Sequence, residues 1–343
     1  MTKSISISAA VLGLTFLLIT PADAQVLYNI TGLGDLGRFS TAWGINDSGQ
    51  VTGHFATANG DIHAYLWSNG VMTDLGPGQG FAINNSGQVT GYMGDSGSPQ
   101  ACVWTNGVMT DLVAPNRRHS QGFGINDSSQ VTGDSDNRAF LWSDGVMTDL
   151  GTLGHWWSQG FGINDNGQVT GGVGTPTIPG DSHPFIWDNG IMTDLGTLGG
   201  IQGTGRGIND SGRVTGYSLT ADGYDHAFLW SDGVMNDLGT LGGDLSYGIG
   251  INDNGWIVGN SSTASDAKHG FLWNNGVMTD LNTLIDPTSG WVLQYANGIN
   301  NAGQIIGSGT YNGESQAFLL TPTPEPATLL LLGLGAAVAV RKQ

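Results

Sequence analysis

The stretch QGFGINDNGQVTG at residues 159–171 decides the fold, because close variants of it recur along the chain. Its core, Ile-Asn followed by Asp or Asn, begins at seven positions spaced by 38, 42, 38, 45, 43 and 48 residues: Ile45, Ile83, Ile125, Ile163, Ile208, Ile251 and Ile299. Repeats of about 40 residues are typical of solenoids and propellers.

Each repeat contains four short segments joined by tight turns. The Asn-Asp-X-Gly turn at 164–167 places Asx side chains and a glycine where a hairpin loop needs them, and Ser-Asp-Gly at 231–233 does the same after the apolar segment 227–230. Helix-forming runs of the kind that ankyrin or tetratricopeptide repeats require are almost absent. We therefore predict an all-β fold, a seven-bladed β-propeller of four-stranded blades over residues 25–321.

The two ends of the repeat region complement each other. The seventh unit stops after its third segment, 317–320, and the missing fourth segment stands at 29–37, where it aligns with 146–154. We expect this N-terminal strand to close the last blade, which leaves no long exposed sheet edge. The same order makes the glycine-rich first segment of every unit the innermost strand. Loss of residues 25–37 should then destabilise the whole domain.

Both flanks of the repeats carry sorting features. Residues 1–24 predict a secretory signal peptide, with Lys3, an apolar run at 5–19 and small residues at 22–24. At the other end an apolar run of fourteen residues, 327–340, stands between a Pro-Glu-Pro motif and two basic residues. As a short hydrophobic helix it would reach only ~21 Å, which suits transient anchoring better than a permanent transmembrane helix.

This tail, residues 322–343, resembles the PEP-CTERM sorting signal of Gram-negative bacteria. The resemblance rests on the start of the apolar run at 327–331 and on five motif residues: Pro324, Glu325, Pro326, Arg341 and Lys342. It implies an exosortase-type processing enzyme as partner, transient inner-membrane anchoring, and a secreted or cell-surface location. Contact with the membrane is expected only through this tail.

The repeats themselves resemble the HAF extracellular repeat. The resemblance rests on HAYLW at 63–67, HAFLW at 226–230 and TDLGTLGG at 193–200. It covers nearly all of residues 25–320, and it implies an extracellular setting without an established activity.

Charge and cysteine content exclude several kinds of partner. The chain carries a net charge of −18; without the two ends, 7 basic and 26 acidic residues remain, or about −19. Such acidity argues against nucleic acid and anionic membrane surfaces as partners. Cys102 is the sole cysteine, so no internal disulfide can form, and its place in a third segment predicts a buried side chain.

Catalytic or binding residues should break the repeat symmetry. Most aspartates follow it and are explained by turn chemistry, including those of the Asn-Asp-X-Gly turns: Asp47, Asp127, Asp165, Asp210 and Asp253. Irregular acids and aromatics instead fall in loops between second and third segments or between units, which share one rim in the predicted strand order. The candidate ligand rim comprises Trp156, Trp157, Trp291, Tyr224, Asp134, Asp136, Asp222 and Asp225.

This rim permits several interpretations. Aromatic faces beside carboxylates can hold sugar rings, and the pairs Asp134/Asp136 and Asp222/Asp225 could ligate Ca²⁺, although neither lies in a complete calcium loop. A solvated polar rim is the simpler interpretation of the acids, and a loop anchor explains the Trp156-Trp157 pair equally well.

No catalytic motif, metal site or cofactor site is predicted. His63, His183, His226 and His269 share one third-segment position, too far from the axis to converge on zinc, and edge hydrogen bonding explains them better. The sequence favours a non-catalytic secreted or surface propeller that binds an extracellular polysaccharide or a surface protein. The alternative is a polysaccharide hydrolase or lyase using rim aspartates, which two irregular carboxylates ~5–9.5 Å apart in one pocket would favour.

Overall fold

The structure is a computed structural model that describes residues 28–34, 39–94, 97–112, 119–174 and 181–323. Leu27–Thr323 forms one compact unit. The predicted signal peptide at 1–24 and the tail residues from Pro324 onward lie outside the described residues. The prediction of an all-β fold is confirmed, since apart from the short 3₁₀ turn η1 (Leu281–Thr283) the regular elements of the described residues are strands.

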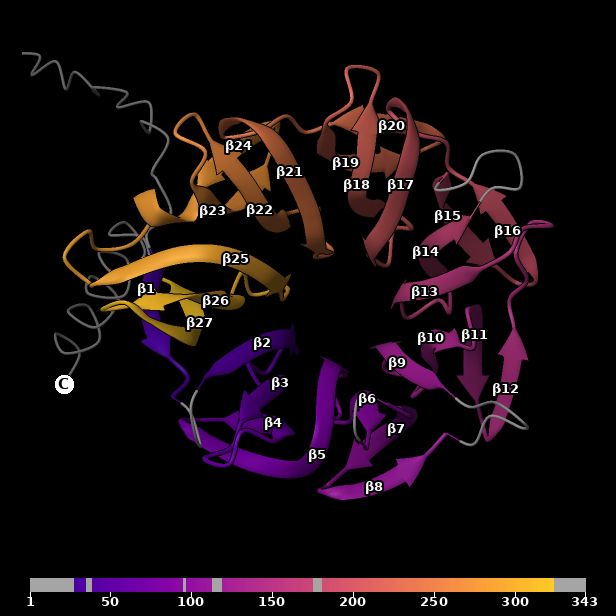
Figure 1. Ribbon diagram of the computed structural model, residues 1–343, viewed down its shortest axis with the longest axis horizontal. Coiled ribbons are helices and arrows are strands. Elements are labelled where there is room, and N and C mark those ends of the chain that lie inside the picture. Colours follow the sequence, from indigo (N-terminus) through magenta and orange to yellow (C-terminus); the bar gives the residue numbers. More distant parts are fainter. Residues whose placement is uncertain (1–27, 35–38, 95–96, 113–118, 175–180, 324–343) are drawn as a thin grey trace, which may run out of the picture. The chain divides into compact units, whose positions relative to one another are not determined.

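Four-stranded antiparallel units repeat seven times in the described residues (Figure 1). Units 1 to 3 comprise β2 (Ser40–Ile45), β3 (Val51–Ala56), β4 (Ile62–Ser68), β5 (Val71–Ile83), β6 (Val89–Met93), β7 (Gln100–Thr105), β8 (Val108–Asp111), β9 (Ser120–Ile125), β10 (Val131–Ser135), β11 (Arg138–Ser143) and β12 (Val146–Asp149). Units 4 and 5 comprise β13 (Ser158–Ile163), β14 (Val169–Gly174), β15 (Ser182–Asp188), β16 (Ile191–Asp194), β17 (Gly199–Ile208), β18 (Val214–Thr220), β19 (Asp225–Ser231) and β20 (Val234–Asp237). Units 6 and 7 comprise β21 (Gly242–Ile251), β22 (Ile257–Thr263), β23 (Lys268–Asn274), β24 (Val277–Asp280), β25 (Trp291–Ile299), β26 (Ile305–Tyr311), β27 (Glu314–Pro322) and β1 (Tyr28–Gly32).

Two connections join neighbouring units into larger sheets. β5 is continuous, so that its first half is the fourth strand of unit 1 and its second half the first strand of unit 2. A single parallel bridge between Ser182 and Gln202 links units 4 and 5. Elsewhere the units are separate sheets in the order first to fourth strand, as in β9-β10-β11-β12.

The N-terminal strand completes unit 7, as the sequence predicted. β1 pairs antiparallel with β27 in a register that runs from Tyr28↔Pro322 to Gly32↔Phe318. Beyond the strand, the Leu33 N–H donates to the Ala317 carbonyl at 3.0 Å. Leu33 is buried in a cluster with Tyr65 and Trp67 of unit 1 and Leu319 of unit 7, so it packs where the first and last units meet.

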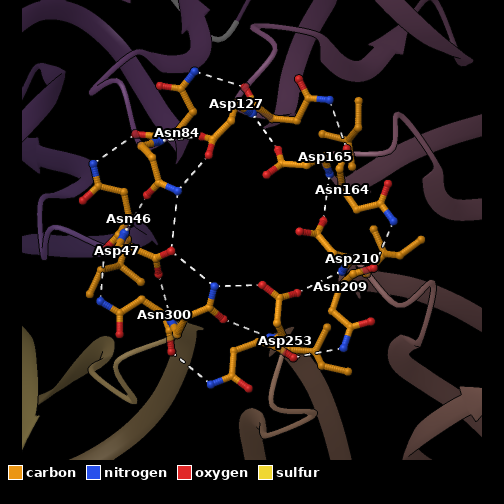
Figure 2. Close-up of a pocket in the computed structure, with 18 of the residues that line it drawn as sticks. Asn46, Asp47, Asn84, Asp127, Asn164, Asp165, Asn209, Asp210, Asp253 and Asn300 are labelled. Atoms are coloured by element: carbon orange, nitrogen blue, oxygen red, sulfur yellow. Dashed lines mark hydrogen bonds between the residues drawn. The ribbon is translucent and has the colours of Figure 1, made fainter.

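Hydrogen bonds between the turns of successive units form a closed circuit (Figure 2). The Asn46 side-chain amide donates to the Asn84 carbonyl at 3.0 Å, and equivalent bonds of 2.9–3.1 Å continue through Asn126, Asn164, Asn209, Asn252 and Asn300, whose amide donates back to the Asn46 carbonyl. A second circuit involves the residue after each of these asparagines. The Asp47 backbone N–H donates to the Asn85 side-chain oxygen of the next unit, equivalent bonds of 2.7–3.0 Å follow in every unit, and the Asn301 N–H donates back to the Asp47 carboxylate.

The units approach one another closely at their first strands. A Cβ on Gly162 would lie 2.9 Å from the Arg206 carbonyl oxygen of the next unit, which explains why glycine precedes the isoleucine in nearly every repeat. The core lies within and between the units, with a large side chain buried at the same third-strand position of most of them, such as Phe140 and Phe228. Cys102 occupies this position in unit 2 and is fully buried, as predicted, and burial raises the pKa of its thiol.

Candidate functional site

A β-bulge in each first strand turns one side chain toward the centre. The pairing register between first and second strands skips one residue in every unit, for instance between Ala42 and Gly44. The skipped residues form a belt around a shared cavity: Trp43, Phe81, Phe123, Phe161, Arg206, Ile249 and Asn297. Bulges re-aim side chains in this way, so the belt residues project where a regular strand would have placed them elsewhere.

The belt encloses a cavity of about 560 Å³. Tyr295 and Asn260 also line it, and at its inner end lies a layer formed by the seven isoleucines of the repeat motif. Cavities of ~300–1,000 Å³ that combine apolar walls with a few polar groups are typical of small-molecule sites. The described residues that line the cavity include one cation, Arg206, and no carboxylate.

Aromatic rings make up one side of the belt. Ring centroids lie 5.2 Å apart for Phe81 and Phe123, and again 5.2 Å apart for Phe123 and Phe161. Trp43 extends the series, with its centroid 6.4 Å from that of Phe81. Four successive units thus present a curved aromatic wall, in which the three phenylalanines are half-buried and Trp43 is exposed.

Arg206 ends this aromatic series. Its guanidinium carbon lies 4.2 Å from the centroid of Phe161 and 5.7 Å from that of Tyr217, within cation–π range of both rings. Its Nε is buried and has no hydrogen-bond acceptor among the described residues. The two rings therefore fix the position of a cation at the cavity wall.

His54 and Tyr247 stand behind the belt in second and first strands. The Trp43 indole donates to His54 Nδ1 at 3.2 Å, and burial lowers the pKa of His54 to about 4, so this imidazole is neutral near pH 7. Tyr217 packs against Tyr247 with 5.2 Å between centroids. Burial raises the pKa of Tyr247 to about 12, and the Asp225 carboxylate, which accepts its hydroxyl hydrogen bond at 3.2 Å, adds to the rise.

Two of the eight predicted rim residues contact residues next to the belt. Asp225 binds Tyr247, as described, and Asp134 accepts a hydrogen bond from the Gln159 amide at 3.1 Å. Burial raises the pKa of the Asp134 carboxyl; the Gln159 hydrogen bond opposes the rise, and the charge of Asp136 adds to it.

The other six are distributed over four units, at the same ends of the strands. Asp136 is in the β10–β11 turn with φ +47°, and Asp222 and Tyr224 lie exposed in the β18–β19 turn. Trp156 precedes β13 and is 84% exposed. Trp157 beside it lies against Gly172 and Gly174 of β14.

Trp291, at the start of β25, packs on its own unit. Its ring centroid is 5.2 Å from that of Tyr311 and 6.1 Å from that of Phe318. Antiparallel pairing places the turns between second and third strands beside the starts of the first strands. The rim residues therefore lie at the end of the belt cavity that is opposite the isoleucine layer.

The opposite end of the centre carries a polar ring (Figure 2). It consists of Asp47, Asn85, Asp127, Asp165, Asp210, Asp253 and Asn301, around a cavity of about 170 Å³. Desolvation raises the pKa of Asp165, and the charges of Asp127, Asp210 and Asp253 contribute to the rise. The sequence explained these aspartates by local turn chemistry alone, whereas their carboxylates also connect neighbouring units.

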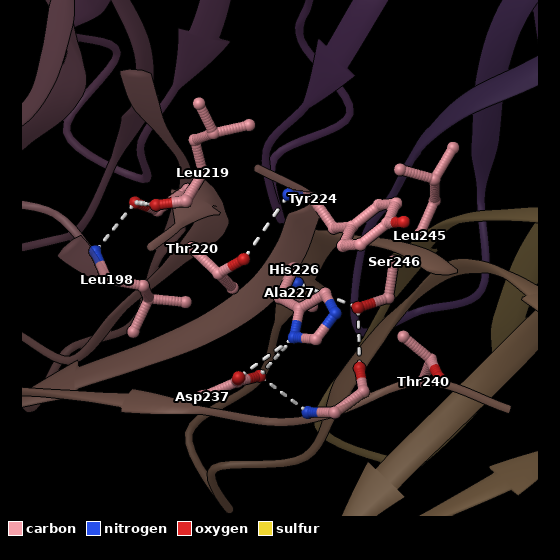
Figure 3. Close-up of polar contacts among 12 residues, drawn as sticks. Leu198, Leu219, Thr220, Tyr224, His226, Ala227, Asp237, Thr240, Leu245 and Ser246 are labelled. Atoms are coloured by element: carbon pink, nitrogen blue, oxygen red, sulfur yellow. Dashed lines mark hydrogen bonds and ion pairs between the residues drawn. The ribbon is translucent and has the colours of Figure 1, made fainter. Parts of the chain in front are cut away.

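The repeated histidines of the third strands bind aspartates of the neighbouring fourth strands, and Figure 3 shows the pair of His226 and Asp237. His226 Nδ1 lies 2.8 Å from Asp237 Oδ2, and equivalent pairs of 2.6–2.9 Å occur at His63, His183 and His269. Nearby, Ser246 Oγ accepts from the Ala227 N–H and donates to the Gly239 carbonyl, a structural role. The prediction of edge hydrogen bonding by these histidines is confirmed.

Within the described ranges, no group of three or more His, Cys, Asp or Glu side chains is arranged to hold a metal ion. None of the helices in that part of the chain has the length and apolarity to cross a bilayer.

The belt is the feature that sequence analysis missed. Its positions vary from Trp43 to Arg206 to Asn297 and stand next to a repeated glycine, so they resemble ordinary irregularity in the innermost strand. The detectable signal was the asymmetry itself: three successive units carry Phe at this position, and Arg206 replaces it in unit 5.

Comparison with known families identifies the tail. Residues 322–343 match the PEP-CTERM protein-sorting motif, which confirms that prediction and marks an exosortase-sorted, extracellular protein. The match concerns the tail alone, and the HAF resemblance of the repeats stays a prediction. No curated protein is similar enough to the chain to count as a relative.

Solved structures resemble the chain in fold. A puromycin-hydrolysing peptidase of Mycobacterium tuberculosis has a TM-score of 0.53 at 11% identity over 85% of this chain and 53% of its own. TolB of Acinetobacter baumannii gives 0.46 at 10% identity over 85% of this chain and 66% of its own. The six-bladed β-propeller lectin of Aleuria aurantia gives 0.36 at 14% identity over 88% of this chain and 99% of its own. The chain thus spans about half of the peptidase and just under two thirds of TolB, and the likeness to the peptidase, at 11% identity, concerns the fold alone.

Proposed function

We propose that the protein is a seven-bladed β-propeller of HAF-type repeats that is exported from a Gram-negative cell, sorted through its PEP-CTERM tail, and binds carbohydrate without cleaving it. The seven four-stranded units, the two closed hydrogen-bond circuits and the pairing of β1 with β27 support the blade number and closure. The sorting motif supports an extracellular setting, in which polysaccharide is an available ligand.

The observation that carries the binding proposal is the aromatic wall of the belt cavity. Trp43, Phe81, Phe123 and Phe161 offer successive rings on a rigid scaffold, and Arg206 and Asn260 supply polar groups in the same cavity. Sugar rings combine apolar C–H faces with hydroxyls, so they match a wall of this composition. The cavity is also large enough for one or two sugar residues.

The carboxylates favour binding over hydrolysis. A glycosidase needs two of them flanking the scissile bond, typically ~5–9.5 Å apart, and the described residues lining the belt cavity include none. Asp134 and Asp225 lie outside the lining, and each has a partner of its own in Gln159 and Tyr247. The rim aspartates therefore serve better as polar surroundings of the mouth than as an acid–base pair.

The exposed rim aromatics Trp156 and Tyr224 extend this proposal outward. Both are on the side to which the cavity opens, where a longer polysaccharide or a surface protein bearing glycans would pass over them. Their contribution is separable from that of the belt, because they belong to turns outside the cavity lining.

A glycan array probed with the exported protein, followed by calorimetry on the retained glycans, tests the proposal. Replacing Phe123 by Ala should weaken binding about 5- to 30-fold through the loss of one stacked ring. Trp156→Ala, an exposed aromatic outside the cavity, is the matched control and should change the affinity for monosaccharides and disaccharides little, because only longer chains reach Trp156. Melting curves of both variants establish that they are folded.

Three results would contradict the proposal. In the first, the array retains no glycan. In the second, Trp156→Ala abolishes binding while Phe123→Ala leaves it intact, which would place the binding site at the rim. In the third, the bound glycan is shortened on incubation. In the last case, loss of cleavage in Asp134→Asn or Asp225→Asn would establish the hydrolase alternative.

A further inference from the structure

We infer that the belt cavity selects acidic sugars and that Arg206 binds their carboxylate. This inference rests on the proposed function and adds the class of ligand. Its basis is the one position of the belt where a cation replaces the repeated aromatic residue.

Arg206 breaks the repeat in a way that packing does not require. Phe81, Phe123 and Phe161 occupy the equivalent position in three successive units, so phenylalanine fits this part of the scaffold. A guanidinium there must instead lose part of its hydration against two aromatic rings.

No acidic side chain among the described residues compensates this cation. Arg206 forms no ion pair with a described carboxylate, although the chain carries a net charge of −18, and its buried Nε has no acceptor. An arginine fixed between rings, with its fork of donors uncommitted, is suited to bind a planar carboxylate. The acceptor that the protein lacks would come from the ligand.

A second cation stands at the same mouth. Lys268 Nζ lies 5.0 Å from the ring centroid of Tyr295, a cavity-lining residue, and donates to its hydroxyl at 3.4 Å. Two units thus each place a cation at this end of the cavity, inside a rim that carries the carboxylates of Asp134, Asp136, Asp222 and Asp225.

The opposite end of the centre repels the same ligand. Five carboxylates of the polar ring, on Asp47, Asp127, Asp165, Asp210 and Asp253, lie beyond the isoleucine layer. An anionic chain therefore enters from the Arg206 side and stops at the isoleucine layer, with its acidic group at the guanidinium and its ring faces against Phe123 and Phe161.

The test compares acidic oligosaccharides with their uncharged counterparts. The probes are hexagalacturonate, hexamannuronate and a hyaluronan hexasaccharide, each also as its carboxyl methyl ester, together with neutral galactan oligosaccharides. Calorimetry with the exported protein should give at least one acid that binds about 10- to 100-fold more tightly than its own ester. Raising the salt concentration should narrow this difference.

Arg206→Gln should abolish the preference for acid over ester, because it weakens acid binding far more than ester binding. Arg206→Phe, which restores the residue found in three other units, should do the same and guards against a variant that fails to fold. Arg213→Gln is the matched control: it removes one positive charge from the same unit, outside the cavity lining, and places there the glutamine found at Gln50, Gln88 and Gln130. It should keep the preference.

The outcomes separate the two proposals. Binding of neutral sugars or esters with no preference for any acid overturns the acidic-sugar inference and leaves carbohydrate binding standing. Retention of the preference in both Arg206 variants also overturns the inference. Absence of binding to every probe, acidic or neutral, overturns both.

Discussion

Deleting residues 25–37 removes β1, the strand that completes unit 7 from the other end of the chain. The loss includes the five-residue register with β27, the Leu33 bond to Ala317 and the Tyr28 N–H bond to the Leu284 carbonyl at 2.9 Å. It also includes the burial of Tyr28 and Leu33, each worth about 2 kcal/mol. With hydrogen bonds at a net of about 1 kcal/mol each, the free energy of unfolding should fall by at least about 5 kcal/mol.

That amount matches the lower end of the total stability of a typical domain. At about 2 °C per kcal/mol for a large domain, the melting temperature should fall by about 10 °C or more. Because β1 connects the first unit to the last, the whole domain should unfold in one transition at the lower temperature.

Differential scanning calorimetry of the deletion variant tests this expectation. Leu33→Ala removes only the apolar contact between the first and last units. Leu150→Ala is its control, because it removes the same atoms at the equivalent position between units 3 and 4. A synthetic peptide of residues 25–37 should restore part of the lost stability. An unchanged melting temperature, or a small early transition followed by unfolding at the original temperature, would refute the closure argument.

Three further predictions concern the interior. Asn164→Ala removes three side-chain hydrogen bonds, one of them buried, and the melting temperature should drop by the equivalent of about 3 kcal/mol. Asp165→Asn keeps the inter-unit bond, removes a repelling charge and should raise the melting temperature slightly; the reverse order would contradict the assigned roles. His54 has a pKa of about 4 in the folded protein and about 6.5 in the unfolded chain, so the unfolded chain binds a proton first as the pH falls from 6.5 to 4. The free energy of unfolding should therefore decline over that window, and it should decline less in His54→Gln. Equal pH profiles of the two proteins in thermal melts would rule this out. Cys102 should react with a thiol reagent only as fast as the domain unfolds, since it is fully buried and burial raises its thiol pKa; rapid labelling of the native protein would show the burial to be wrong.

Repeat arithmetic predicted the fold well. The spacing of the Ile-Asn-Asp motif gave the units, their turns gave the strands, and the missing fourth segment after 317–320 matched the segment that forms β1. These inferences succeed because turn chemistry and strand pairing are local and the units repeat them.

The candidate site was less predictable. A bulge changes the direction of Trp43 or Arg206 without any sequence signal stronger than the neighbouring glycine, so the alternation of a regular strand misplaces them. Belt residues also come from units 38–48 residues apart, and their convergence depends on the closure of the circle. Conversely, irregular loop residues are conspicuous in sequence, and only two of the eight, Asp134 and Asp225, contact residues next to the cavity.

The two closed circuits of hydrogen bonds make repeat number a structural constant. In an open array, duplication of one unit merely lengthens the stack, and unequal recombination between similar repeats is tolerated. Here the asparagine side-chain amide of each turn donates to a backbone carbonyl of the next unit, and the bond from the Asn300 amide to the Asn46 carbonyl closes the circuit. A protein with one repeat more or fewer would need a different angle between every pair of neighbouring units. Selection therefore acts on the number of repeats as a whole.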